Sequence, residues 1–196
     1  MPIPARALVD ANVLYSNHLR NLLLQMAQNG AFEVRWTAEI EDEWLRNMEP
    51  LTRDRIRRNT IPLIREIFPE ALVGDFDPTL ATGKTDAKDR HVASAARHIS
   101  PCVLVTENVR HFDAAVLREA KVEVRTVDEF LVGLVDTFTD NPGFIRQAVD
   151  EARISLKKSM PSWDEYLDLL AERQGLPRFV ARLRGMEPTP EPTDTI

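Results

Sequence analysis

The chain has 196 residues, of which 43% are hydrophobic and 29% are charged, and its formal net charge is −6. This composition is ordinary for a globular protein and excludes the collagen-like, disordered and disulfide-scaffold classes. The acidic balance argues against a protein that holds nucleic acid by bulk electrostatics, whereas a local basic patch can still contact phosphates.

The sequence also indicates a compartment. Its apolar runs are far shorter than the ~20 residues that a membrane-spanning helix needs, so we expect no membrane segment. An acid at Asp10 interrupts any candidate signal-peptide core. The single cysteine, Cys102, excludes an internal disulfide, which suits a reducing environment. We therefore expect a cytoplasmic protein.

Up to Val135, short apolar runs alternate with segments of helical periodicity. A leucine-rich segment with apolar residues at i, i+3, i+4 and i+7 ends at Gly30, which predicts a helix closed by a glycine. Thr126 and Glu129 form a capping box that begins another helix. The expected strands are 7–9, 32–36, 71–73, 102–106 and 122–125. The expected helices are one around 19–26 and others over 37–49, 52–67, 86–99, 112–120 and 126–135.

This alternation predicts a parallel sheet covered on both faces, because parallel strands are joined by helical crossovers. We predict a three-layer α/β/α domain over residues 1–138. Strand patterns stop after Thr139, and helical patterns cover 144–158, the segment after a Ser162–Glu165 capping box, and 176–183. We predict a helical C-terminal extension over 139–185 and, because prolines recur there, a disordered tail over 186–196.

Polar side chains gather where the predicted sheet would bind a ligand, beyond the carboxyl ends of its strands. Asp10 and Asn12 follow the first strand, Thr106 and Asn108 follow the strand 102–106, and Asp89 lies near the start of the helix before it. Several carboxylates without a cysteine or histidine cluster favour a hard divalent ion, Mg²⁺ or Mn²⁺. Lys84, Lys88 and Arg90 flank Asp89 and are candidate contacts for phosphate.

Four segments occur together in one order: V-D-A-N-V-L-Y-S, D-E-W-L-R-N, K-D-R-H-V-A-S-A-A and V-L-V-T-E-N-V-R-H-F. In this combination the sequence resembles PIN-domain ribonucleases, of the kind found as VapC-type toxins of toxin-antitoxin pairs, over about residues 6–133. The resemblance implies a metal-dependent endoribonuclease that leaves a 5′-phosphate. It also implies a homodimer and a cognate antitoxin that covers the acidic cleft.

The resemblance assigns Asp10, Glu43 and Asp89 as the three metal-holding acids. The family often has a fourth acid where this chain has Asn108, which can bind a metal through its carbonyl but brings no charge. Asn12, Thr106, Asp86 and Asp113 are then expected to support the ligands through hydrogen bonds or as auxiliary ligands. His111 is a further polar neighbour that can compensate for the missing acid.

Alternatives remain for these residues. Asp10, Asp86 and Asp89 are also suited to capping helices, which is a common role for aspartate. Periodicity on the helix 37–49 places Glu41 nearer the apolar face than Glu43, so only the motif selects Glu43. The arginines of 52–67 form either an RNA contact or a solvated face.

Two other functions compete with a nuclease. A weakened PIN-like module that binds RNA or a protein without cutting is suggested by Asn108. A receiver-type phosphoacceptor domain is disfavoured because it needs a pair of acids after its first strand, whereas this chain has Asp10 alone.

Overall fold

A computed structural model describes residues 5–80, 82–157 and 159–186. The predicted tail, apart from Met186, lies outside the described residues. Five parallel strands form one sheet in the order β3-β2-β1-β4-β5. The strands are β1 (Ala5–Val9), β2 (Phe32–Thr37), β3 (Leu72–Val73), β4 (Cys102–Val105) and β5 (Val122–Arg125).

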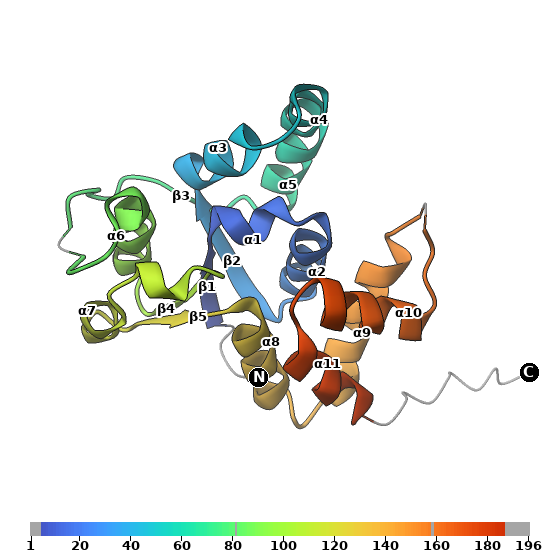
Figure 1. Cartoon of the computed structure of the whole chain (residues 1–196). Coiled ribbons are helices and arrows are strands. Elements are labelled where there is room, and N and C mark those ends of the chain that lie inside the picture. The colour runs from blue at the N-terminus through green and yellow to red at the C-terminus, as the bar shows by residue number, and fades with distance from the viewer. Residues whose placement is uncertain (1–4, 81, 158, 187–196) are drawn as a thin grey trace, which may run out of the picture.

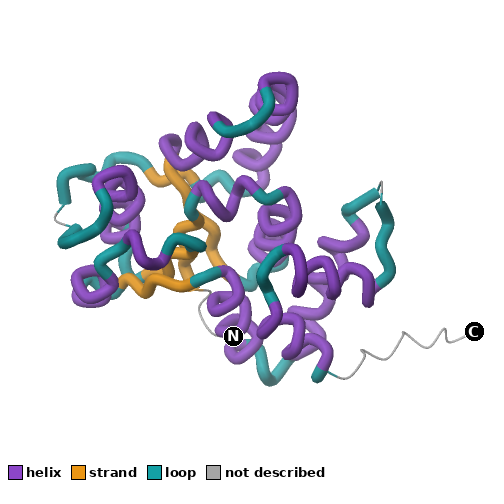
Figure 2. The backbone as a smooth tube through the Cα atoms, viewed as in Figure 1, coloured by secondary structure: helices purple, strands orange, loops and turns teal. Residues whose placement is uncertain are grey.

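Helices account for most of the rest of the described chain. They are α1 (Ala11–Tyr15), α2 (Asn17–Gln28), α3 (Ala38–Arg46), α4 (Pro50–Arg55), α5 (Ile61–Ile67), α6 (Arg90–His98), α7 (Ala114–Glu119), α8 (Val127–Thr137), α9 (Pro142–Ile154), α10 (Trp163–Asp168) and α11 (Pro177–Arg184). In Figure 1, α6 and α7 lie on one side of the sheet and α1, α2 and α8 on the other. Figure 2 shows the strands as one central group between these helices. The predicted three-layer α/β/α fold is confirmed.

The central strands form the core because both faces of the sheet are covered. Leu8, Val9, Leu104 and Val105 are fully buried, as expected for parallel strands with apolar side chains on both faces. On one face, Phe130 of α8 meets Phe32 of β2 edge to face, with ring centroids 5.0 Å apart. The ends of the inner strands β1 and β4 carry the polar residues of interest.

Several predicted helices differ from the structure in their bounds. The apolar period around Leu19–Met26 is preceded by a separate short helix, α1, because Ser16 adopts an extended conformation and caps α2 through its hydroxyl. The helix predicted over 52–67 begins earlier, at Pro50, because proline is well suited to a first helical position. It also contains a π-helical segment, Ile56–Thr60. The helix predicted over 86–99 opens with a 3₁₀ turn, Ala87–Asp89.

The helical C-terminal extension packs on the sheet domain through two helices, α9 against α2 and α11 against α8. The helix predicted over 144–158 begins earlier, as α9 at Pro142, and ends earlier, at Ile154, because residues 155–157 are not helical; residue 158 lies outside the described residues. Asn21 of α2 donates to the carbonyl of Ala152 at 2.9 Å, and Gln25 of α2 donates to Glu151 at 2.8 Å. Both predicted capping boxes, Thr126–Glu129 and Ser162–Glu165, are present.

A carboxylate from α8 caps the last helix of the extension. The two oxygens of buried Asp128 accept hydrogen bonds from the backbone N–H groups of Arg178 at 3.3 Å and Phe179 at 2.8 Å. These groups lie at the start of α11, where helical N–H groups have no partner within the helix. Phe179 itself is fully buried. The extension is therefore anchored by an apolar core and by a cap supplied from outside it.

Candidate active site

The polar residues at the sheet edge meet where the strand order reverses. Chain order runs outward from β1 through β2 to β3 on one side and from β4 to β5 on the other. Val9 pairs with Val105 in the register of β1 and β4, so Asp10 and Thr106 lie beside each other at the carboxyl ends. Such a reversal is the usual ligand-binding position of an open parallel sheet.

Asp10 is buried and held by three donors. Its Oδ1 accepts a hydrogen bond from Ala11 N at 2.6 Å, which caps α1, and its Oδ2 accepts from Asn12 Nδ2 and Thr106 Oγ1, both at 2.7 Å. Asn12 Nδ2 also donates to Thr106 Oγ1 at 3.0 Å. Asp10 therefore both caps α1 and lies at the candidate site, and the side chains of Asn12 and Thr106 both donate to its carboxylate.

A cleft of about 420 Å³ opens above this carboxylate. The four residues predicted as metal ligands, Asp10, Glu43, Asp89 and Asn108, all line it. They come from the end of β1, from α3, from the turn before α6 and from the loop after β4. Asn108 is held there because its backbone N–H donates to Thr106 Oγ1 at 3.0 Å.

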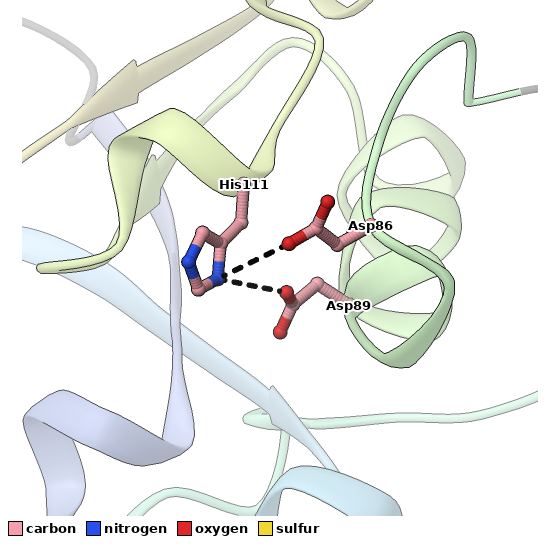
Figure 3. A group of neighbouring side chains, drawn as sticks. All are labelled: Asp86, Asp89 and His111. Carbon is pink, nitrogen blue, oxygen red and sulfur yellow. Dashed lines mark hydrogen bonds and ion pairs between the residues drawn. The ribbon is translucent and has the colours of Figure 1, made fainter.

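Asp89 is oriented by His111, which the sequence analysis named as a polar neighbour able to compensate for the missing acid. His111 Nδ1 lies 3.1 Å from Asp89 Oδ2 and 3.7 Å from Asp86 Oδ2 (Figure 3). Asp89 stands at the N-cap of α6 but makes no capping hydrogen bond through its side chain. Its carboxylate is therefore available to the cleft and to His111, and the capping alternative for Asp89 is not observed.

The carboxylates of the cleft lie close enough to raise one another's pKa. Burial raises the pKa of Asp10, hydrogen bonds from Thr106 and Ala11 lower it, and the charge of Asp89 raises it. Burial also raises the pKa of Glu43, which the charge of His91 lowers and that of Asp10 raises. Bringing a cation among these carboxylates would relieve this repulsion.

The packing of α3 places Glu41 and Glu43 in different surroundings. Glu41 is buried and faces away from the cleft, where its carboxylate accepts from Arg65 at 2.7 Å and from Trp36 Nε1 at 3.3 Å. Glu43 is half-buried and lines the cleft, with its Oε2 3.6 Å from His91 Nε2. The apolar periodicity of α3 correctly places Glu41 on the buried side of the helix. A buried carboxylate needs a partner, and Glu41 forms an ion pair with Arg65.

Other candidates lie outside the lining of the cleft. Asp113 caps α7 and accepts from the backbone N–H of Lys84 at 3.0 Å, so it holds the loop before α6. Three residues were predicted to contact RNA: Lys84, Lys88 and Arg90. Of these, only Lys88 is among the described residues that line the cleft. Arg90 Nε donates to the carbonyl of Thr85 at 3.4 Å. Two arginines of the helical segment 50–67 form ion pairs with α3, Arg57 with Asp42 and Arg65 with Glu41.

Sequence reasoning missed four residues of this region. His91 is buried between two acids of α3, 3.8 Å from Glu39 and 3.6 Å from Glu43. Tyr15, Arg46 and Asn47 line the cleft. The available signal for Tyr15 was an aromatic side chain outside the apolar stripe of its helix, since Val13 and Leu14 are the buried residues of α1. His91 carried no comparable signal.

The donor set fits a hard divalent ion. Asp10, Glu43 and Asp89 supply carboxylate oxygens and Asn108 an amide carbonyl, the ligand types that Mg²⁺ and Mn²⁺ prefer. Asp86, Asp89 and His111 also form a group whose ligand atoms lie within 4.8 Å of one another. Asp89 belongs to both groups, so any ion bound at the cleft would be influenced by His111.

Comparison with known proteins gives two family matches. The PIN domain family matches residues 6–110, and the VapC50 C-terminal domain family matches residues 127–185. The second match begins before the predicted boundary between 138 and 139, at the start of α8, a helix that packs on both the sheet and α11. That boundary stays a prediction.

A protein of Mycobacterium tuberculosis (strain ATCC 25618 / H37Rv) named "Putative ribonuclease VapC50" is 27% identical over 117 residues. The match covers 60% of this chain and 66% of that relative, just under two thirds of its length. No solved structure matched the chain. Among the residues the structure describes, no helix has both the length and the apolar character to cross a bilayer. Because the PIN match covers just over half of the sequence and the second match is to a VapC domain, the chain belongs to the PIN-domain family and is of the VapC type.

Proposed function

We propose that this protein is a divalent-metal-dependent endoribonuclease that acts as the toxin of a toxin-antitoxin pair. The observation that carries the proposal is the convergence of Asp10, Glu43 and Asp89 on one cleft at the reversal of strand order. The PIN-domain and VapC matches support it. Hydrolysis of a phosphodiester needs neutralisation of the phosphate charge and a base for the attacking water, and this cleft supplies groups suited to both.

Asp10 and Asp89 are the residues that would hold Mg²⁺ or Mn²⁺. Asn12 and Thr106 fix the orientation of Asp10, and His111 fixes that of Asp89. An ion held there would supply the positive charge that stabilises the charge developing on the phosphate. The surrounding hydrogen bonds leave each carboxylate little freedom, which lowers the entropic cost of presenting it correctly.

Glu43 is placed to accept the proton of the attacking water. The side chain of Glu43 lies on the wall of the cleft and is the least buried of the three acids. Burial and the charge of Asp10 both raise the pKa of Glu43. Lys88 lines the same cleft and can contact a phosphate oxygen. Attack of water on phosphorus with departure of the 3′-oxygen leaves the 5′-phosphate expected for the family.

A cleavage assay on total cellular RNA, with the cut ends mapped, tests this function. Purified protein should cut RNA with Mg²⁺ or Mn²⁺, leave 5′-phosphates and lose activity in EDTA. Unchanged cutting in EDTA would overturn the metal-dependent mechanism. No cutting of any RNA with either ion would favour the second candidate, a PIN-like module that binds RNA or protein without cleavage.

Asn108 is the observation that favours this second candidate, because it lines the cleft without adding charge. The adjacent acid does not replace it, since Glu107 Oε1 accepts a hydrogen bond from Val127 N at 3.2 Å at the start of α8. The site then has about three formal negative charges for its ion, and we expect weak binding of Mg²⁺ by the protein alone.

Asn108→Asp should tighten Mn²⁺ binding. An added carboxylate near a divalent ion contributes at least ~1 kcal/mol even in a solvated site, which corresponds to about a fivefold lower Kd. Calorimetry with Mn²⁺ on both proteins measures the change. Glu107→Gln is a matched control, because it alters charge at the next residue without altering the cleft, and its Kd should stay unchanged. An unaltered or higher Kd for Asn108→Asp would show that Asn108 does not face the ion.

We propose two protein partners: a second copy of the chain and an antitoxin that covers the acidic cleft. An arginine inserted among the carboxylates would suit such an antitoxin, since a guanidinium pairs with carboxylates in bidentate fashion. Light scattering should show a homodimer at micromolar concentration, and a strict monomer would count against it. Co-expression of the antitoxin should suppress toxicity, and undiminished toxicity would reject the pairing.

A further inference from the structure

One wall of the cleft carries an exposed aromatic ring. Tyr15 is 52% exposed and lines the cleft together with Asp10, Glu43 and Asp89. The other aromatic residue of the lining, Trp44, is only 3% exposed. A large, half-exposed ring at the mouth of an acidic cleft is not explained by packing or by metal binding.

Local structure explains why this ring is presented to the cleft and not buried. Asp10 caps the first turn of α1, and Val13 and Leu14 anchor that helix in the core. The helix ends at Tyr15, because Ser16 turns the chain into an extended conformation and caps α2. The backbone of Tyr15 is therefore fixed at the end of a short helix that is anchored at both ends. Its ring lies outside the buried side of that helix and stays accessible.

The wall beside Tyr15 is polar and includes a cation. Trp44 is held in place because the guanidinium of buried Arg20 lies 4.7 Å from the centroid of its ring. The end of α3 brings exposed Arg46, its last residue, and Asn47, its C-cap, to the cleft lining. Within the described part of the chain, the side chain of Arg46 makes no ion pair, although its charge lowers the pKa of Glu43. These three groups match the parts of one nucleotide. An aromatic face can stack on the base, a cation can contact the phosphate, and an amide can form hydrogen bonds with the edge of the base.

We propose that Tyr15 is a stacking platform for an unpaired nucleobase of the RNA substrate, next to the phosphate held at the cleft. Arg46 contacts the neighbouring phosphate. Asn47, which lines the same cleft, forms a hydrogen bond with the edge of the base. The proposal rests on the function proposed above, because it takes RNA to be the substrate. A base inside a duplex has no free face, so the nucleotide that occupies this subsite is single-stranded.

The experiment measures RNA binding apart from cleavage. All variants are made in an Asp89→Asn background, which leaves the Asp10 cap of α1 intact, and binding of a short single-stranded oligoadenylate is measured with Mg²⁺ present. Base stacking on an aromatic side chain is worth ~1–3 kcal/mol, so Tyr15→Leu should raise the Kd by about 5-fold to 150-fold. Tyr15→Phe and Tyr15→Trp, which keep an aromatic face, should bind within about twofold of the background.

A second readout locates the base. With 2-aminopurine moved along the oligoadenylate, one position should lose fluorescence on binding to the background protein, since stacking quenches this base. The quenching should be absent with Tyr15→Leu. Removing the base at that position should weaken binding to the background protein and leave binding to Tyr15→Leu unchanged. Leu63→Ala, which truncates an apolar side chain of similar exposure (54%) on α5, is the matched control and should leave binding unchanged.

Equal Kd values for the background protein and Tyr15→Leu would overturn the proposal, and would leave the exposed ring as a contact for a protein partner. Equal weakening by Leu, Phe and Trp would also overturn it, because a merely structural role does not distinguish an aromatic face from its absence. The proposed function fails by a different result, which is absence of cleavage by the unmodified protein with Mg²⁺ or Mn²⁺. Stacking that depends on Tyr15 in a protein that does not cleave would retain the subsite and reject the nuclease.

Discussion

Replacement of Asp89 or Asp10 with asparagine is expected to reduce the rate of RNA cleavage by at least about a thousandfold. Each substitution removes a charged ligand from the ion whose contribution to a phosphoryl transition state is several kcal/mol, and each 1.36 kcal/mol is a factor of ten in rate. Asp89→Asn is the cleaner change, because Asp89 is partly exposed and its main contact is His111 at 3.1 Å. Initial rates with saturating Mg²⁺ measure the loss.

Asp10→Asn also changes hydrogen bonds within the protein, so its effect on folding must be measured separately from its effect on cleavage. Asp10 Oδ2 accepts from both Asn12 and Thr106, so an amide nitrogen at that position would meet two donors. The raised pKa of Asp10 means that its charged form is disfavoured by folding, so removal of the charge acts in the opposite direction. Circular dichroism and thermal unfolding should therefore show a folded protein with a small change in Tm.

Glu41→Gln is the matched control for these substitutions. It removes an acid from the same helix as Glu43, but Glu41 contacts Arg65 and Trp36 and faces away from the cleft. It should keep the cleavage rate within about twofold and lower the free energy of unfolding by ~1 kcal/mol, since one partner of the ion pair is half-exposed. If Asp89→Asn retains a rate within tenfold of the original protein, Asp89 does not hold the ion.

Phe179→Ala is expected to lower the free energy of unfolding by ~3–5 kcal/mol. Phe179 is fully buried in the core that α11 shares with α8, and truncation of a buried phenylalanine loses both transfer free energy and packing around the cavity it leaves. Chemical denaturation at constant pH measures the change. A loss this large is a substantial part of the stability of an ordinary domain.

Its neighbour Arg178 provides the control. Arg178→Ala removes an exposed side chain but keeps the backbone N–H that donates to Asp128, so unfolding should change by less than ~0.5 kcal/mol. A loss below ~1 kcal/mol for Phe179→Ala would mean that α11 is not packed on α8 in solution.

Local signals predicted much of the fold. The Thr126–Glu129 and Ser162–Glu165 boxes lie within one helical turn, so their partners could be recognised in the sequence and both boxes form. The parallel sheet followed from the alternation of strand and helix patterns. Helix bounds were less predictable: the break at Ser16 and the π-helical turn at Ile56–Thr60 depend on what the helices pack against.

Contacts between distant residues account for what the sequence could not provide. Periodicity identified the buried face of α3 but not Arg65, which engages Glu41 and leaves Glu43 for the cleft. His111 had no local signal for its place beside Asp89, because the two residues come from separate loops. The same holds for the cap that Asp128 supplies to α11. Each of these contacts joins residues whose spacing in the sequence has no regular period.

The position of the cleft at the junction of β1 and β4 has a consequence for biosynthesis. Asp10 emerges from the ribosome before Thr106, which donates to its carboxylate and is separated from it by 96 positions. Nascent chains that end after β3 contain Asp10 and Glu43 and lack Asp89, Asn108 and the strand that aligns them. Because domains fold as units during synthesis, the candidate site cannot be assembled until β4 and its following loop have been made, and translation products truncated before β4 would lack it.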